Sequence, residues 1–157
     1  MSAVEAVRAL RTAGHSVATA ESLTGGLVCA TLVAVPGASD VVRGGVVAYT
    51  AQAKIGVLGV DAGLVARRGT VDGEVASAMA VAAARLFGSD WGLATTGVAG
   101  PDPSEGKPVG TVHVAVSGPG GVRARQLRLS GDREAIRHAT VADVLSWLVD
   151  RVEEESR

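Results

Sequence analysis

The segment HSVATAESLTGGLVCATLVAVPG, residues 15–37, decides the fold. Its first part, 15–20, is short and apolar, which predicts a β-strand. Residues 24–35 predict a helix that ends before Pro36, because proline disfavours the helical conformation in the residue that precedes it. A strand followed at once by a helix is the first half of the crossover that parallel strands require. This segment therefore predicts an α/β protein.

The flanking segments extend this pattern along the chain. The expected helices are 2–13, 51–58, 72–87 and 131–153, and the expected strands are 44–50, 91–97 and a hairpin within 110–131. The β-branched run at 44–50 is typical of a buried strand. After the short helix 51–58, irregular backbone is expected to about residue 70. Together these elements predict a single domain over 1–157, a three-layer α/β sandwich in which helices flank a mixed, partly parallel β-sheet.

Periodicity assigns apolar faces to these elements. The expected buried positions are Val4, Val7 and Leu10; Val75, Met79, Ala82 and Leu86; Val112, Val114 and Val116; and Val141, Val144, Leu145 and Leu148.

Composition limits the class of protein. The 157 residues are 47% hydrophobic but only 3% aromatic, so alanine and valine must fill the core. A net charge of −1 provides no basic field for nucleic acid. The single cysteine, Cys29, excludes an internal disulfide. No apolar run is long enough for a membrane span and the N-terminus does not resemble a signal peptide, so we expect a soluble, cytoplasmic protein.

Ser22 lies at the polar junction between the first strand and the helix. Gly25 and Gly26 would let a ligand approach the backbone, and the free N–H groups of the first helical turn could bind an anion or an oxyanion. An ordinary helix-capping role for Ser22 explains the same residues. The histidines His15, His113 and His138 do not favour a Ser-His pair, and no spacing of His, Cys, Asp and Glu indicates a metal site.

Other polar residues follow the later strands. Tyr49 ends the second strand, and Lys54 lies in the helix after it. Thr96 and Gly97 end the strand 91–97. If these strands are parallel, Ser22, Tyr49 and Thr96 meet at one edge of the sheet. A lysine can act as a base only when it is neutral, and the alternative is that Lys54 is an ordinary solvated helix residue.

Two further features suit an anionic ligand. The Gly/Pro-rich loop 95–111 offers Lys107, and Arg133 and Arg137 lie four residues apart at the start of the last helix, where two guanidinium groups suit a phosphate. The alternatives are a surface loop and arginines paired with carboxylates such as Glu134.

Five ordered motifs, TAESLTGG, VVAYTAQAKIGVLGV, TTGVAGP, KPVGTVHVAV and GDREAIR, resemble the C-terminal domain family of the competence/damage-inducible protein CinA over roughly residues 4–150. Members of that family include stand-alone nicotinamide-mononucleotide deamidases, and the chain resembles this stand-alone form. The resemblance implies a nucleotide substrate, no metal and no cofactor. It implies Ser22 as nucleophile and Lys54, assisted by Tyr49, as base. Donors from Thr24, Gly25 and Gly26 or from Thr96 and Gly97 would hold the oxyanion, and Arg133 the phosphate.

The sequence departs from the family pattern in two places. The segment that usually reads Tyr-Ser-Asn-x-x-Lys has Thr50 and Ala51 in the middle, and Asp102 and Pro103 replace a glycine-richer loop. Two alternatives therefore stay open: a non-catalytic nucleotide-binding or regulatory module, and an amidase for another small carboxamide. An Ala/Val-rich surface helix would suit a homo-oligomer.

Overall fold

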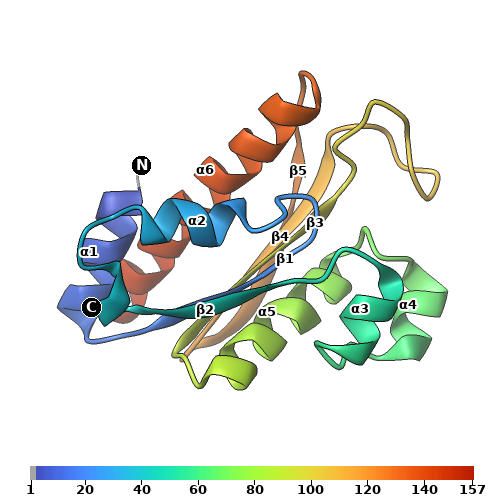
Figure 1. Ribbon diagram of the computed structural model, residues 1–157. Coiled ribbons are helices and arrows are strands. Elements are labelled where there is room, and N and C mark those ends of the chain that lie inside the picture. Colours follow the sequence, from blue (N-terminus) through green and yellow to red (C-terminus); the bar gives the residue numbers. More distant parts are fainter. Residues whose placement is uncertain (1–2) are drawn as a thin grey trace.

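A computed structural model describes residues 3–157 and contains a five-stranded mixed sheet with the strand order β2-β1-β3-β4-β5 (Figure 1). The strand β1 pairs in parallel with both β2 and β3, whereas β4 and β5 continue the sheet in antiparallel pairing. The strands are β1 (Val17–Glu21), β2 (Val42–Val47), β3 (Trp91–Gly97), β4 (Thr111–Gly118) and β5 (Gly121–Arg128). The helices are α1 (Ala3–Ala13), α2 (Leu27–Val33), the 3₁₀ turn η1 (Ala38–Asp40), α3 (Ala51–Gly56), α4 (Ala62–Arg68), α5 (Gly73–Phe87) and α6 (Arg133–Glu155).

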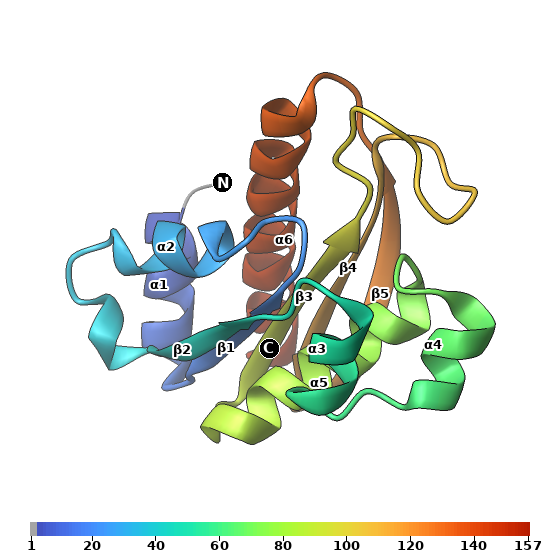
Figure 2. The ribbon, with the colours of Figure 1, turned by 45° about the vertical axis from the view of Figure 1, so that its right-hand side comes forward.

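Helices cover both faces of the sheet, which confirms the predicted three-layer α/β architecture. In Figures 1 and 2, α1, α2 and α6 lie on one face, and α3, α4 and α5 lie on the other. Each face has its own core: residues of α1, α2 and α6 pack on one side, and an alanine-rich cluster centred on α5 packs on the other. The valines of β4 and the expected apolar positions of α6 are buried as predicted.

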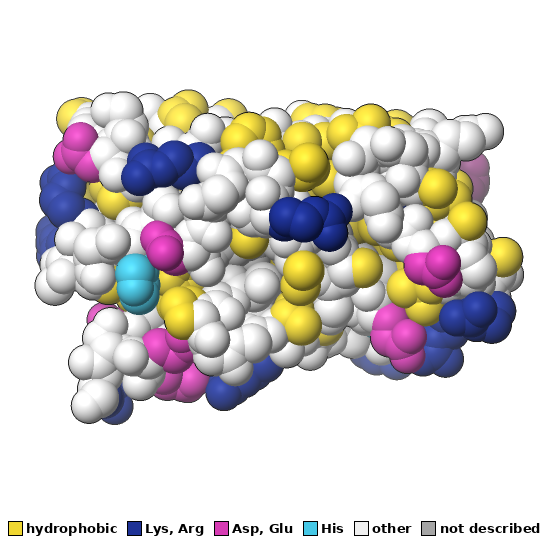
Figure 3. Space-filling view, turned by 90° about the horizontal axis from the view of Figure 1, so that it is seen from below, with side chains coloured by type: hydrophobic (Ala, Val, Ile, Leu, Met, Phe, Trp, Pro, Cys, Tyr) yellow, Lys and Arg dark blue, Asp and Glu magenta, His cyan; other side chains and the backbone are white. Residues whose placement is uncertain are grey.

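The alanine-rich face depends on very close packing between α5 and β3. A Cβ atom added at Gly92 of β3 would lie 1.9 Å from the carbonyl oxygen of Ala80 in α5. Glycine is therefore required at this position. The outer surface of this layer, seen from below in Figure 3, shows small groups of hydrophobic side chains interspersed with acidic and basic ones.

Several details differ from the sequence predictions. The run expected as a buried strand at 44–50 is an edge strand, β2, in which every second residue is exposed and which ends at Val47. The expected irregular connection contains α4. Two residues expected to be buried, Val4 and Leu86, are 49% exposed. The helix expected from residue 24 begins at Leu27, and the expected start of the first helix at residue 2 lies outside the described residues.

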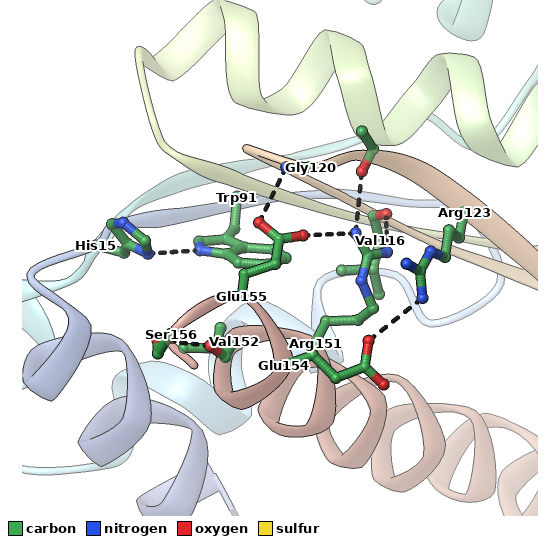
Figure 4. A network of polar contacts seen from close by, with 11 residues as sticks. His15, Trp91, Val116, Gly120, Arg123, Arg151, Val152, Glu154, Glu155 and Ser156 are labelled. Atoms are coloured by element: carbon green, nitrogen blue, oxygen red, sulfur yellow. Dashed lines mark hydrogen bonds and ion pairs between the residues drawn. The ribbon is translucent and has the colours of Figure 1, made fainter.

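A buried arginine joins the last helix to the hairpin, at the end of the sheet where β1 begins (Figure 4). The guanidinium of Arg151 donates to the carbonyl oxygens of Val116 and Gly121 and to Glu155, and it lies 5.6 Å from the centre of the Trp91 ring. Glu155 also accepts the backbone N–H of Gly120 at 2.9 Å. These contacts satisfy turn backbone groups and fix α6 across β4.

Candidate active site

Alternation along β1 sends its last residues to opposite faces of the sheet. Val17 packs in the core beneath α1 and α2, whereas Ala18 and Ala20 pack beneath α5. Because consecutive side chains in a strand point to opposite faces, Glu21 lies under α2 and Ser22 follows on the side of α3. Since β2, β1 and β3 are parallel, their carboxyl ends meet at one edge, and the connections leaving β1 and β2 cover opposite faces. Such a reversal point is where ligands bind in open α/β sheets.

Ser22 and Lys54 meet at this edge. The Nζ atom of Lys54 lies 2.9 Å from Oγ of Ser22 and donates a second hydrogen bond to the carbonyl oxygen of Ala48 at 2.9 Å. The side chains are buried: Ser22 is 7% exposed and Lys54 is 1% exposed. The carbonyl of Ala48 occupies one N–H of the amine. The lone pair of a neutral amine is therefore free to accept the hydroxyl proton of Ser22 at the same distance.

Burial lowers the pKa of Lys54, because a charged amine loses its hydration inside the protein. The carboxylate of Glu105 acts in the opposite direction and favours the protonated amine. Desolvation is the larger effect, so the neutral form is populated at lower pH than in a free lysine. This is the property that a lysine base requires.

Glu21 occupies the donors that the sequence assigned to a bound anion. Its carboxylate, 1% exposed, accepts the backbone N–H groups of Val28 at 2.8 Å and Cys29 at 3.0 Å. It also accepts the hydroxyl of Thr24 at 2.7 Å. The expectation that the first turn of α2 is free for a ligand is therefore wrong for these N–H groups. The capping interpretation of Ser22 is also wrong, because Gly26 is the N-cap and Glu21 supplies the capping oxygens.

A cavity of about 290 Å³ opens beside Ser22. Arg133 lines it and donates to the hydroxyl of Tyr49 at 3.0 Å and to the carbonyl oxygen of Gly100 at 2.5 Å. Tyr49 is 59% exposed and contacts Arg133 through its hydroxyl. The lining residues are Ser22, Leu23, Tyr49, Thr70, Val71, Thr96, Gly97, Val98, Ala99, Gly100, Asp102, Ser104 and Arg133.

The loop after β3 forms one wall of this cavity, and Figure 2 shows it at the same end of the sheet as the first turn of α6. Glu105 holds the loop against the α4–α5 connection: its carboxylate accepts the N–H and hydroxyl of Thr70 and the N–H of Val71. Lys107 donates to the carbonyl of Val71. The hydroxyl of Thr96 donates to the carbonyl of Thr70 at 2.8 Å. The loop is therefore an anchored wall, as its prolines suggest.

Several candidate residues lie away from Ser22. His15 accepts a hydrogen bond from Trp91 near the beginning of β1, and His138 is exposed beside Glu134. His113 lines a neighbouring cavity with Lys107, and burial lowers its pKa. Arg137 does not share the contacts of Arg133. Its guanidinium donates to the backbone carbonyl oxygens of Leu23 and Thr24.

Larger cavities, of about 650 and 540 Å³, lie between α1 and α6 and near the start of β2, away from the Ser22–Lys54 pair. The Ser22–Lys54 contact, and not the volume of a cavity, distinguishes the candidate site. Within residues 3–157, no group of three or more His, Cys, Asp and Glu side chains is arranged to hold a metal ion. The described helices include none that is both long and apolar enough to cross a membrane.

Thr50 and Ala51, where the sequence departs from the family pattern between Tyr49 and Lys54, lie at the N-terminus of α3. The hydroxyl of Thr50 accepts the N–H of Ala53 at 3.1 Å and caps α3, the helix that carries Lys54. Threonine thus supplies a side-chain cap for this helix. Ala51 is the first residue of α3. Asp102 is exposed on the rim of the cavity.

Sequence reasoning missed the supporting roles of Glu21, Thr95 and Glu105. The hydroxyl of Thr95 lies 2.7 Å from that of Thr24, which itself binds Glu21. One signal was available for Glu21: a carboxylate at a strand end, directly before a glycine-rich turn and a helix without a Ser, Asp or Asn cap.

Comparisons with known proteins agree with this architecture. The CinA C-terminal domain family matches residues 2–152. A CinA-like protein of Frankia casuarinae is 50% identical over 130 residues, which cover 83% of this chain and 30% of the relative. A CinA-like protein of Anaeromyxobacter is 48% identical over 143 residues, covering 90% of this chain and 35% of the relative. The chain thus spans about a third of the length of these curated relatives.

Solved structures match over nearly their whole length. A CinA superfamily protein from Klebsiella pneumoniae superposes with a TM-score of 0.94 at 32% identity, covering 97% of this chain and 96% of the other. A competence/damage inducible protein from Agrobacterium tumefaciens gives a TM-score of 0.90 at 37% identity, covering 94% and 92%. The family match, the identities and these superpositions together show that the chain belongs to the CinA C-terminal domain family.

Proposed function

We propose that this domain hydrolyses the carboxamide of nicotinamide mononucleotide to nicotinic acid mononucleotide and ammonia, a reaction that recycles pyridine nucleotides. The observation that carries the proposal is the buried Lys54 amine 2.9 Å from the hydroxyl of Ser22, at the wall of a cavity that Arg133 also lines. A Ser-Lys pair is a known variant of the serine acyl-transfer arrangement.

In this proposal, neutral Lys54 takes the proton of Ser22 while Oγ attacks the carboxamide carbon. The resulting lysine ammonium returns the proton to the departing amino group, so the C–N bond breaks and ammonia leaves an ester on Ser22. A water molecule, activated by the same amine, then adds to the ester carbon. Collapse of this second intermediate releases the carboxylic acid and restores the serine.

The substrate phosphate is assigned to Arg133, which must exchange its contact with the hydroxyl of Tyr49 for a phosphate oxygen. Release from Arg133 would free that hydroxyl to assist Lys54. The oxyanion donors are assigned to the Thr96–Gly97 strand end. Two observations support this assignment. Thr96 and Gly97 line the cavity beside Ser22, and the N–H groups of Gly25, Leu27, Val28 and Cys29 already have partners within the chain. Because the hydroxyl of Thr96 donates to Thr70, the donor would be a backbone N–H of this strand end.

The test is ammonia release from purified protein incubated with nicotinamide mononucleotide. Ser22→Ala and Lys54→Met should each abolish release while thermal unfolding stays cooperative. Full activity in Ser22→Ala would refute the mechanism. Wild-type protein that binds the nucleotide without releasing ammonia would instead support a non-catalytic module. Turnover of other small carboxamides alone would identify an amidase of different specificity.

A further inference from the structure

Two arginines one turn apart on α6 have different partners. Arg133 faces the cavity, where it contacts Tyr49 and Gly100. Arg137 donates from Nε to the carbonyl oxygen of Leu23 at 2.9 Å and from Nη2 to that of Thr24 at 3.2 Å. Its guanidinium is thus bound to backbone, and Arg137 is not among the residues that line the cavity.

The two carbonyls that Arg137 binds belong to the residues directly after Ser22. They lie in the turn between β1 and α2, ahead of the first residue of the helix. Gly25 completes the same turn with a φ of +59°, and a Cβ added there would lie 3.6 Å from Nη2 of Arg137. The guanidinium therefore lies directly against the turn and holds two of its carbonyl groups in one planar fork. Lysine cannot reproduce this geometry.

The turn is held from two layers of the protein. Lys54 approaches Ser22 from α3 on one face of the sheet, and Arg137 reaches the turn from α6 on the other. Without Arg137, the carbonyls of Leu23 and Thr24 lose the contacts that fix them to α6. The Oγ atom of Ser22 is then less firmly held relative to the amine and the cavity. A displacement of about 1 Å at a reacting atom costs on the order of 100-fold in rate.

We propose that Arg137 is a positioning residue for the Ser22 nucleophile and not a ligand of the substrate phosphate. This inference rests on the proposed serine chemistry. It predicts that the loss of Arg137 lowers kcat with little change in KM. The loss of Arg133, the phosphate ligand of the proposed function, raises KM.

The test combines two readouts on the whole chain. The first is steady-state ammonia release from nicotinamide mononucleotide by Arg137→Met, Arg137→Lys and Arg133→Met. The second is the rate at which a fluorophosphonate probe labels Ser22, followed by mass spectrometry. In that labelling, the serine oxygen bonds to phosphorus, fluoride leaves and the serine proton passes to the base, so no substrate is needed. Arg43→Met is the matched control, because the exposed Arg43 also donates to a backbone carbonyl, that of Asp40, at the far end of β2.

We expect Arg137→Met to lower both kcat and the labelling rate by about 100-fold, with KM changed less than about twofold. Arg137→Lys should recover part of both rates, and Arg43→Met should match the wild type. Raised KM with unchanged kcat and labelling in the two Arg137 variants would assign Arg137 to substrate binding and overturn the inference. Wild-type protein that is labelled but releases no ammonia would refute the proposed substrate alone, and slower labelling of Arg137→Met would still support positioning. Wild-type protein that is neither labelled nor active would overturn both.

Discussion

Replacing Glu21 by glutamine tests whether the buried carboxylate supports the turn that carries Ser22. Its two oxygens accept four donors: Thr24 and Val28 on Oε1, at 2.7 and 2.8 Å, and Cys29 and Thr19 on Oε2, at 3.0 and 3.3 Å. Glutamine preserves the shape but exchanges one oxygen for an NH₂ group. The backbone N–H on the exchanged oxygen, that of Val28 or Cys29, would then face another donor in this buried site, whereas the threonine hydroxyl beside it can rotate and accept.

The magnitude follows from those contacts. Hydrogen bonds to a charged group contribute about 1.5–3 kcal/mol each, and a buried donor without an acceptor costs about 1–3 kcal/mol. Removing the buried charge offsets part of this loss. We therefore expect Glu21→Gln to lower the free energy of unfolding by about 2–4 kcal/mol, a large share of the roughly 5–15 kcal/mol typical of a domain.

Urea denaturation, read as the midpoint at constant m-value, measures this change. Glu134→Gln is the control, because Glu134 is a glutamate in the first turn of α6 whose side chain is 81% exposed. That substitution should change stability by less than about 0.5 kcal/mol. If Glu21→Gln were as stable as Glu134→Gln, the carboxylate would not be supporting the turn and the reasoning would be wrong.

The rate of ammonia release should rise with pH as Lys54 loses its proton, and it should level off above the pKa of Lys54, which burial lowers. A kcat that falls with pH over this range would contradict a lysine base. Gly92→Ala should lower the free energy of unfolding by about 1–3 kcal/mol or more, because the added Cβ would lie 1.9 Å from the carbonyl oxygen of Ala80. Thermal or urea unfolding measures this change, and wild-type stability would show that α5 can move away without cost. Arg151→Met should lower the free energy of unfolding by about 2–4 kcal/mol, because the carbonyls of Val116 in β4 and Gly121 in β5 lose their guanidinium donor and Glu155 keeps only the N–H of Gly120. Ammonia release measured below the unfolding range should stay close to wild type.

The fold was accessible from the sequence because strand and helix signals alternate clearly from residue 15 onward. The exposure of β2 was not, since a β-branched run looks alike in a central and in an edge strand. The helix α4 was missed although Asp61 caps it by accepting the N–H of Leu64 at 2.9 Å. An aspartate before an alanine-rich segment was the available signal.

The candidate site was only partly accessible. Ser22 and Lys54 could be placed at strand ends, but their contact depends on β2 lying next to β1, and strand order has no local signature. The different contacts of Arg133 and Arg137 were hidden for a similar reason. Their spacing on one helix is visible in the sequence, whereas the turn that meets Arg137 lies far away along the chain.

The origin of Ser22, Lys54 and Arg133 in three separate connections has an evolutionary consequence. A phosphate-binding loop is one contiguous segment of sequence, so a single recombination event can transfer it from one fold to another. The proposed centre is not modular in that sense, because Ser22 follows β1, Lys54 lies on α3 and Arg133 begins α6. Recombination of any single strand–helix unit would transfer one member and leave the others behind. Such chemistry is inherited with an intact sheet or not at all.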